Sequence, residues 1–130
     1  MFKKLYSLAI ALAIALPSFA QTGSGSLKDV IKDEKLEENA ERLGKIFRNE
    51  FSSIKSDMIE LVRGKGLLNA VVIRNQPGKT AWDVCVAMAE NGVLAKPTHG
   101  NIIRFAPQLV MNEEQLRDCI AISKKTISEF

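Results

Sequence analysis

Residues 93–107 read Val-Leu-Ala-Lys-Pro-Thr-His-Gly-Asn-Ile-Ile-Arg-Phe-Ala-Pro, two short apolar runs on either side of a polar turn that contains proline and glycine. Apolar runs bounded by such turn residues are typical of strands. We therefore expect short strands over residues 93–95 and 101–105, which flank a turn over residues 96–100.

One basic side chain, Arg104, interrupts the apolar run Ile-Ile-Arg-Phe-Ala. A guanidinium in that setting must reach water or meet an anion, because leaving it buried and unpaired is costly. Carboxylate is the anion whose planar geometry best fits the arginine fork. Arg104 is therefore a candidate anion-binding residue, and the alternative is an arginine that reaches the surface beside apolar neighbours without a ligand.

A second pair of strands is expected upstream, over residues 58–62 and 67–73. The segment between them, Arg63-Gly64-Lys65-Gly66, contains glycines that permit the positive φ of a tight reversal. A phosphate-binding loop would need a Lys-Ser/Thr ending and a following helix, whereas a strand follows here. We interpret Gly64-Lys65-Gly66 as a hairpin turn.

Three helices complete the pattern. The first is expected over residues 33–53, the second begins after a capping Thr80 and stops at Gly92, and the third begins at Asn112 with a capping partner at Gln115. Apolar side chains recur at helical spacing in these segments. They are Leu36, Ala40, Leu43, Phe47, Phe51 and Ile54, then Ala81, Val84, Cys85 and Met88, then Leu116, Cys119, Ile120, Ser123 and Ile127. The order α-β-β-α-β-β-α predicts an α+β fold in which helices cover a small antiparallel sheet.

The N-terminal residues differ in composition from the rest. Residues 1–20 carry a short basic start, an apolar run and small residues before Gln21, the layout of a secretory signal peptide. The alternatives are a buried helix of the domain and a mitochondrial transit peptide. Residues 21–27 are expected to be a Gly/Ser-rich linker and residues 28–130 the domain. The chain would then be secreted or periplasmic, and no stable membrane span would remain after removal of the signal.

Charge and cysteine content exclude some classes of protein. The chain has 130 residues and a net charge of +3, and Lys3 and Lys4 supply two of those positive charges. No basic block remains in the domain, so nucleic-acid binding is not expected. One histidine and two distant cysteines do not form a metal site. Cys85 and Cys119 are interpreted as free apolar thiols, with one disulfide as the alternative.

The segments 62–70 and 93–107 closely resemble the C-terminal small domain of ornithine aminotransferase, a class-III, fold-type I enzyme that depends on pyridoxal phosphate. The resemblance runs from about Leu36 to Phe130. It implies that Arg104 holds a substrate carboxylate in the cleft between the large and small domains. One departure is Gln108, where a second proline is expected after Pro107.

The resemblance also implies what this chain does not supply. In the full enzyme, the δ-amino group of ornithine passes through the cofactor to 2-oxoglutarate, which gives glutamate semialdehyde and glutamate. The cofactor lysine of related enzymes lies in the large domain, so we expect no catalytic and no cofactor-binding residue here and no transamination by this chain alone. An aminotransferase large domain or a homodimer is the expected partner. The alternatives are an exported noncatalytic interaction module and a truncated or fused gene product, and a chain without the leader would be cytoplasmic or mitochondrial.

Four other features receive structural interpretations. His99 is expected to be a turn residue and Lys96 to have a structural or surface role rather than to bind the cofactor. Trp82 is expected to pack or to form an interface. The acidic residues Asp33, Glu34, Glu37 and Glu38 are expected to form a solvated helix start.

Overall fold

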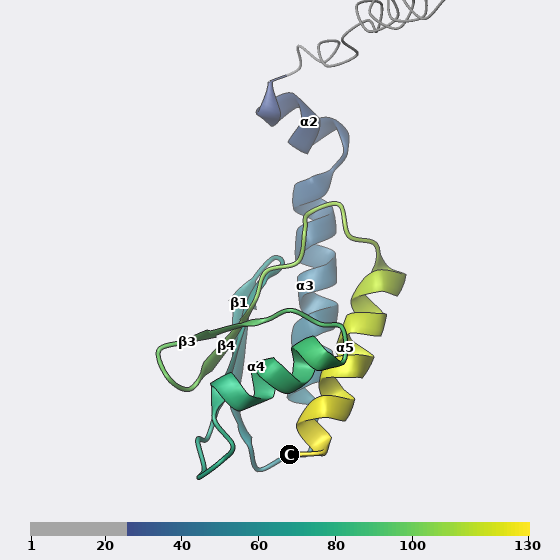
Figure 1. Cartoon of the computed structure of the whole chain (residues 1–130). Coiled ribbons are helices and arrows are strands. Elements are labelled where there is room, and N and C mark those ends of the chain that lie inside the picture. Colours follow the sequence, from purple (N-terminus) through teal and green to yellow (C-terminus); the bar gives the residue numbers. More distant parts are fainter. Residues whose placement is uncertain (1–25) are drawn as a thin grey trace, which may run out of the picture. The chain divides into compact units, whose positions relative to one another are not determined.

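Three helices cover one face of a four-stranded antiparallel sheet in the computed structural model, which describes residues 26–130 (Figure 1). Neighbouring strands follow the order β1-β2-β4-β3. The elements are α2 (Leu27–Asp33), α3 (Leu36–Ser52), β1 (Ile59–Lys65), β2 (Leu68–Ile73), α4 (Ala81–Glu90), β3 (Lys96–Thr98), β4 (Ile102–Phe105) and α5 (Glu113–Ser128). The α+β prediction and the expected order of α3 to α5 are confirmed, with α2 as an additional short helix.

Both predicted capping sites are confirmed. The Thr80 side chain accepts a hydrogen bond from the Asp83 backbone, and the Asp83 carboxylate accepts one from the Thr80 backbone. Asn112 and Gln115 make the same reciprocal pair at the start of α5. These bonds satisfy backbone N–H groups that a helix start otherwise leaves without partners.

The helix predicted over residues 33–53 begins later than expected. Lys35 adopts a left-handed backbone with a φ of 50°, which separates α2 from α3. The buried side chains of α3 are nevertheless those of the predicted apolar stripe from Leu36 to Phe51. The periodic pattern therefore identified the buried face correctly but not the break before it.

Two strand predictions are wrong at their ends. β1 continues to Lys65, so Arg63, Gly64 and Lys65 belong to the strand and only Gly66 and Leu67 make the reversal. The strand predicted over residues 93–95 lies instead at Lys96–Thr98. Both strands are fixed by pairing across tight hairpins, Lys65 with Leu68 and Thr98 with Ile102, and the glycine and proline of these segments indicated turns instead.

The core lies between the sheet and the helices. Val71 and Ile73 of β2 and Ile103 of β4 are fully buried, and the residues that alternate with them face away from the helices. Phe47 and Phe51 of α3 stack with ring centroids 4.3 Å apart, and Phe105 contacts both rings. This packing fixes which face of the sheet stays open.

The N-terminal predictions are not tested by the structure. The proposed signal peptide, residues 1–20, and residues 21–25 of the proposed linker lie outside the described residues. Within residues 26–130, no helix combines the length and the apolar character needed to cross a membrane.

Candidate functional site

Arg104 lies on the face of the sheet that no helix covers. It stands on β4 between Ile103 and Phe105, whose side chains are buried, while its own side chain is exposed. Among the described residues, no carboxylate pairs with Arg104. The guanidinium therefore reaches solvent, and the expectation that it must find water or an anion is met by its position.

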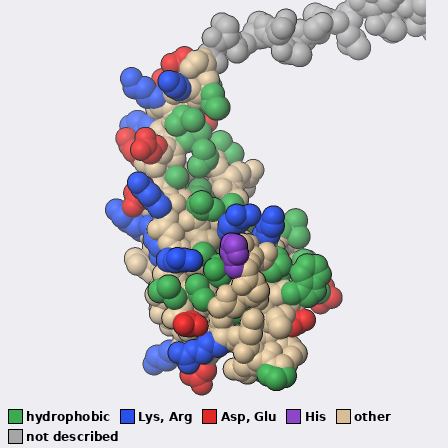
Figure 2. Space-filling view, turned by 90° about the vertical axis from the view of Figure 1, so that its left-hand side faces the viewer, with side chains coloured by type: hydrophobic (Ala, Val, Ile, Leu, Met, Phe, Trp, Pro, Cys, Tyr) green, Lys and Arg blue, Asp and Glu red, His purple; other side chains and the backbone are tan. Residues whose placement is uncertain are grey.

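Three basic residues share one row across this open face. Arg63 of β1 pairs with Ala70 of β2, Ala70 pairs with Arg104 of β4, and Arg104 pairs with Lys96 of β3. Paired residues of antiparallel strands point to the same side. We call Arg63, Arg104 and Lys96, together with Ala70 between the two arginines, the basic row. Figure 2 shows the open face, where basic and apolar side chains lie together.

The row includes a residue that sequence reasoning missed. Arg63 was interpreted as part of a turn, but the longer β1 places its side chain on the open face. The alternation of Leu61, Arg63 and Lys65 along the chain is the signal that could have indicated a strand with these side chains on one side.

A shallow hollow of about 330 Å³ lies beside the basic row. Ala70 has a small side chain, which leaves space between the two arginines. The residues that line the hollow are Arg63, Gly64, Lys65, Leu68, Asn69, Ala70 and Arg104. The side chains that face the hollow offer guanidinium and ammonium groups but no carboxylate, whereas the Asn69 side chain is buried, so the hollow suits an anion.

Basic residues on the helical side have a different environment. Every ion pair that the structure describes in residues 26–130 joins side chains of α3, α5 or the end of α5. Glu50, for example, accepts a hydrogen bond from Lys124 at 2.6 Å, and that bond lowers the pKa of the Glu50 carboxyl. Glu113 is paired with Arg117 and Arg42, and these contacts lower its pKa. The basic side chains of the open face lack such internal partners.

A hydrogen-bonded turn holds the β1–β2 hairpin in place. Arg48 of α3 donates to the Gly66 carbonyl at 3.1 Å and to Asn69 Oδ1 at 2.9 Å. The buried Asn69 also donates to the Gly66 carbonyl. Gly66 has a φ of 53°, which favours glycine. The interpretation of Gly64-Lys65-Gly66 as architecture agrees with this geometry, although the reversal begins only at Gly66.

The other candidates are dispersed over the surface. His99 lies in the exposed turn between β3 and β4 with a φ of 52°, so it is a turn residue as predicted. Trp82 is 65% exposed on α4, so it does not pack in the core, and its proposed interface role stays a prediction. Glu37 and Glu38 are exposed in the first turn of α3, whereas Asp33 ends α2.

The two cysteines are free thiols. Cys85 lies on the buried side of α4, and burial raises its pKa to about 11. Cys119 is half-buried, and burial together with the neighbouring Asp118 raises its pKa. Such thiols stay protonated near neutral pH and are poor nucleophiles. Within the described residues, no group of three or more histidine, cysteine or acidic side chains could hold a metal ion.

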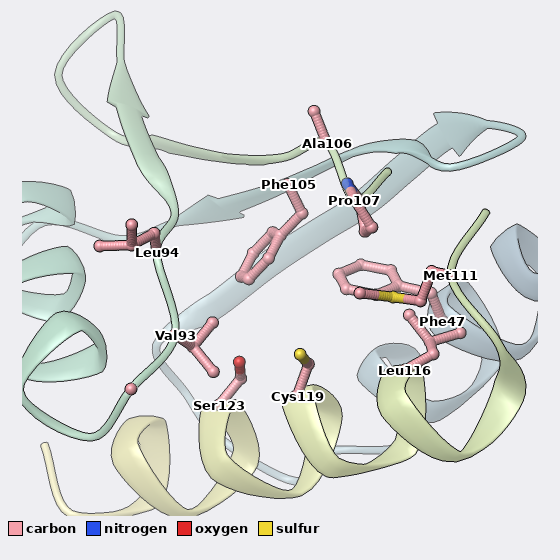
Figure 3. Close-up of a pocket in the computed structure, with 11 residues that line it drawn as sticks. Phe47, Val93, Leu94, Phe105, Ala106, Pro107, Met111, Leu116, Cys119 and Ser123 are labelled. Carbon is pink, nitrogen blue, oxygen red and sulfur yellow. The ribbon is translucent and has the colours of Figure 1, made fainter. Parts of the chain in front are cut away.

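A separate pocket of about 140 Å³ lies on the helical side. Figure 3 shows Leu116, Cys119 and Ser123 of α5 pointing into it from one side, with Phe105 and Pro107 on the other. Its lining is mainly apolar and holds no charged side chain. This pocket is a gap in the packing between α5 and the sheet. Unlike the hollow beside the basic row, it offers no charged group to a ligand.

Comparison with known proteins identifies relatives of the chain. Residues 17–127 match the family described as Aminotransferase class-III. The chain is 56% identical over 99 residues to the mitochondrial ornithine aminotransferase of Drosophila melanogaster and 50% identical over 102 residues to that of Rattus norvegicus. These matches cover 76% and 78% of this chain but only 22% and 23% of the relatives. The chain thus spans less than a quarter of their length.

Solved structures give the same result. An acetylornithine aminotransferase from Elizabethkingia anophelis superposes with a TM-score of 0.74 at 58% identity, over 78% of this chain and 27% of that one. The ornithine aminotransferase of Toxoplasma gondii superposes with a TM-score of 0.71 at 41% identity, over 77% of this chain and 24% of that one.

Proposed function

Because the chain belongs to the class-III aminotransferase family, we propose that residues 28–130 are the small domain of an ornithine aminotransferase and that Arg104 binds a substrate carboxylate. The name of the relatives supports ornithine as a substrate, and the family resemblance implies 2-oxoglutarate as its partner substrate; both carry a carboxylate. The observation that carries the proposal is an exposed guanidinium beside a hollow that holds no acidic side chain.

The role of this domain is binding rather than bond rearrangement. Pyridoxal phosphate supplies the electron sink of the family's chemistry and needs a lysine, a phosphate cup and an acid beside its ring nitrogen. The hollow beside Arg104 has no acidic side chain for the ring nitrogen, and its neighbour Lys96 is an exposed strand residue paired with Arg104. These residues do not fit the cofactor. We therefore propose that the chain alone holds no pyridoxal phosphate and does not transaminate.

The open face is the proposed contact surface for an aminotransferase large domain. Leu61 is 50% exposed and Leu68 is 58% exposed there. Both lie next to the basic row, whose charged side chains have no ion-pair partner among the described residues. Apolar side chains that stay exposed in a group often mark an interaction surface. A large domain that covers this face would turn the shallow hollow into an enclosed site. A homodimer is the second partner that the family resemblance supports.

The same exposed residues support a second candidate function, an exported noncatalytic module that binds a partner through the open face. The composition of residues 1–20 favours export, whereas the Drosophila and rat relatives are named as mitochondrial. Export and cleavage before Gln21 can be tested by secretion of the full chain and N-terminal sequencing.

A titration tests the role of Arg104. Addition of 2-oxoglutarate to the ¹⁵N-labelled chain is expected to shift the Arg104 Nε–H signal in NMR spectra. Arg104→Gln is expected to weaken that binding by about three- to fivefold, the range of one exposed ion pair. Arg74→Gln is the matched control, because it removes the same charge at an exposed arginine outside the row. Equal affinities of the two variants would contradict the proposal.

A further inference from the structure

The two arginines of the basic row, Arg63 and Arg104, are placed so that both could contact one ligand. Arg63 and Arg104 lie on β1 and β4, with β2 between them, so their Cα atoms are about 10 Å apart. Both side chains line the same hollow. Neither has a carboxylate partner among the described residues.

Ala70 makes a shared ligand sterically feasible. It pairs with Arg63 on one side and with Arg104 on the other, so it lies midway between them on the same face. Its methyl group is the smallest side chain that a non-glycine residue could place there. The space above Ala70 is therefore open to both guanidinium groups.

Electrostatics favours an anion in that space. Arg104 faces Lys96 directly across the β3–β4 pair, and like charges in directly opposed positions are destabilising. Lys65 adds a third positive charge to the lining of the hollow, beside Arg63 and Arg104. A bound anion would relieve this repulsion, and the planar forks of two arginines can together satisfy both oxygens of a carboxylate.

We infer that Arg63 is a second carboxylate-binding residue, which holds one carboxylate together with Arg104 above Ala70. This inference rests on the proposed role of Arg104 and extends it to a positioning pair. Arg63 fixes the orientation of the carboxylate because it approaches from the opposite side of Ala70.

The first test uses the full chain and 2-oxoglutarate as the probe. The Nε–H signals of Arg63 and Arg104 are expected to shift with the same dissociation constant. Arg63→Gln is expected to weaken binding by about three- to fivefold. Arg63→Lys keeps the charge but not the fork, so it is expected to recover only part of that loss. Arg74→Gln again controls for the change in net charge, and the dispersion of the amide signals verifies that each variant is folded.

The second test fills the space above Ala70 without changing the charge of the chain. Ala70→Leu is expected to fill the position between the two arginines and to abolish the shifts of both Nε–H signals. Val72→Leu is the matched control, because Val72 lies on the same face of β2 and pairs with Ile102 outside the basic row. Wild-type affinity in the Ala70→Leu variant would overturn the shared site.

The two sets of variants distinguish a failure of the Arg63 inference from a failure of the proposed Arg104 role. If Arg104→Gln weakens binding but Arg63→Gln behaves like Arg74→Gln, the second residue is wrong and the role of Arg104 stands. If Arg104→Gln also behaves like Arg74→Gln, the proposed role of Arg104 fails, and the shared site fails with it.

Discussion

Gly44 lies where α3 passes closest to the β1–β2 hairpin. A Cβ atom added at this position would stand 1.8 Å from the Gly66 carbonyl oxygen, which Arg48 holds by a hydrogen bond. The contact atom is backbone, so it cannot move away as a flexible side chain could. This single residue therefore sets the distance between α3 and the turn at one end of the hollow.

The substitution Gly44→Ala tests that contact. Alanine favours a helix by about 1 kcal/mol over glycine, but the overlap with Gly66 is expected to outweigh this gain and to lower the free energy of unfolding by about 1–3 kcal/mol net. Urea denaturation measures the change. Lys45→Ala, at the next and exposed position of α3, is expected to change stability by no more than about 0.5 kcal/mol. A Gly44→Ala variant more stable than the wild type would contradict the close approach.

Several single residues could be predicted because their signals are local. Thr80 and Asn112 cap their helices as expected, since a cap depends only on the next three residues. Arg104 could be recognised because a charged side chain within an apolar run must reach water or an anion, whatever the fold. Arg63 was missed because its position depends on pairing with Ala70, and the glycines beside it indicated a turn.

At the scale of elements, α3 and α5 are joined by ion pairs. Glu50 contacts Lys124 and Arg117, and Glu113 contacts Arg42 and Arg117. The pKa values of both carboxyl groups are lowered by these contacts, chiefly by hydrogen bonds from Lys124 and Arg117 respectively. In the unfolded chain both groups bind protons more readily than in the folded one.

The two lowered pKa values predict how stability depends on pH. Their contribution is complete above the ordinary glutamate pKa of about 4.5 and is lost as the pH falls through the lower folded values. The free energy of unfolding is therefore expected to decrease from pH 6 toward pH 3. Glu50→Gln is expected to reduce that dependence, measured by urea denaturation across the range. Glu60→Gln, on β1 without a described ion pair, is expected to retain it, and equal slopes in the two variants would argue against the α3–α5 pairs.

The strands show why the elements could be predicted only in part. Helical stripes were identified correctly because periodicity is a local property that survives packing. The ends of β1 and β3 were wrong by up to three residues because both strands run into tight hairpin turns, and glycine and proline that belong to the strands resembled turn residues. In β3, Pro97 and the polar neighbours indicated a turn, although Lys96 and Thr98 pair with β4.

At the scale of the whole molecule, one face of the sheet is covered and the other is open. The covered face carries the core and the ion-paired helices, while the open face carries unpaired basic residues and exposed leucines. The chain matches less than a quarter of the Drosophila and rat enzymes. The absence of a basic block predicts no nucleic-acid-binding role, which stays a prediction. The three-dimensional arrangement is what places Arg63, Ala70 and Arg104 in one row.

The central proposal is that this chain binds a carboxylate but neither holds pyridoxal phosphate nor transaminates. It is tested by measuring turnover by the purified chain with ornithine, 2-oxoglutarate and pyridoxal phosphate, and then by borohydride reduction and mass spectrometry of the same sample. We expect no formation of glutamate semialdehyde above the protein-free reaction and no stoichiometric cofactor adduct at any single lysine, Lys96 included. Steady turnover together with one fully modified lysine would contradict this proposal.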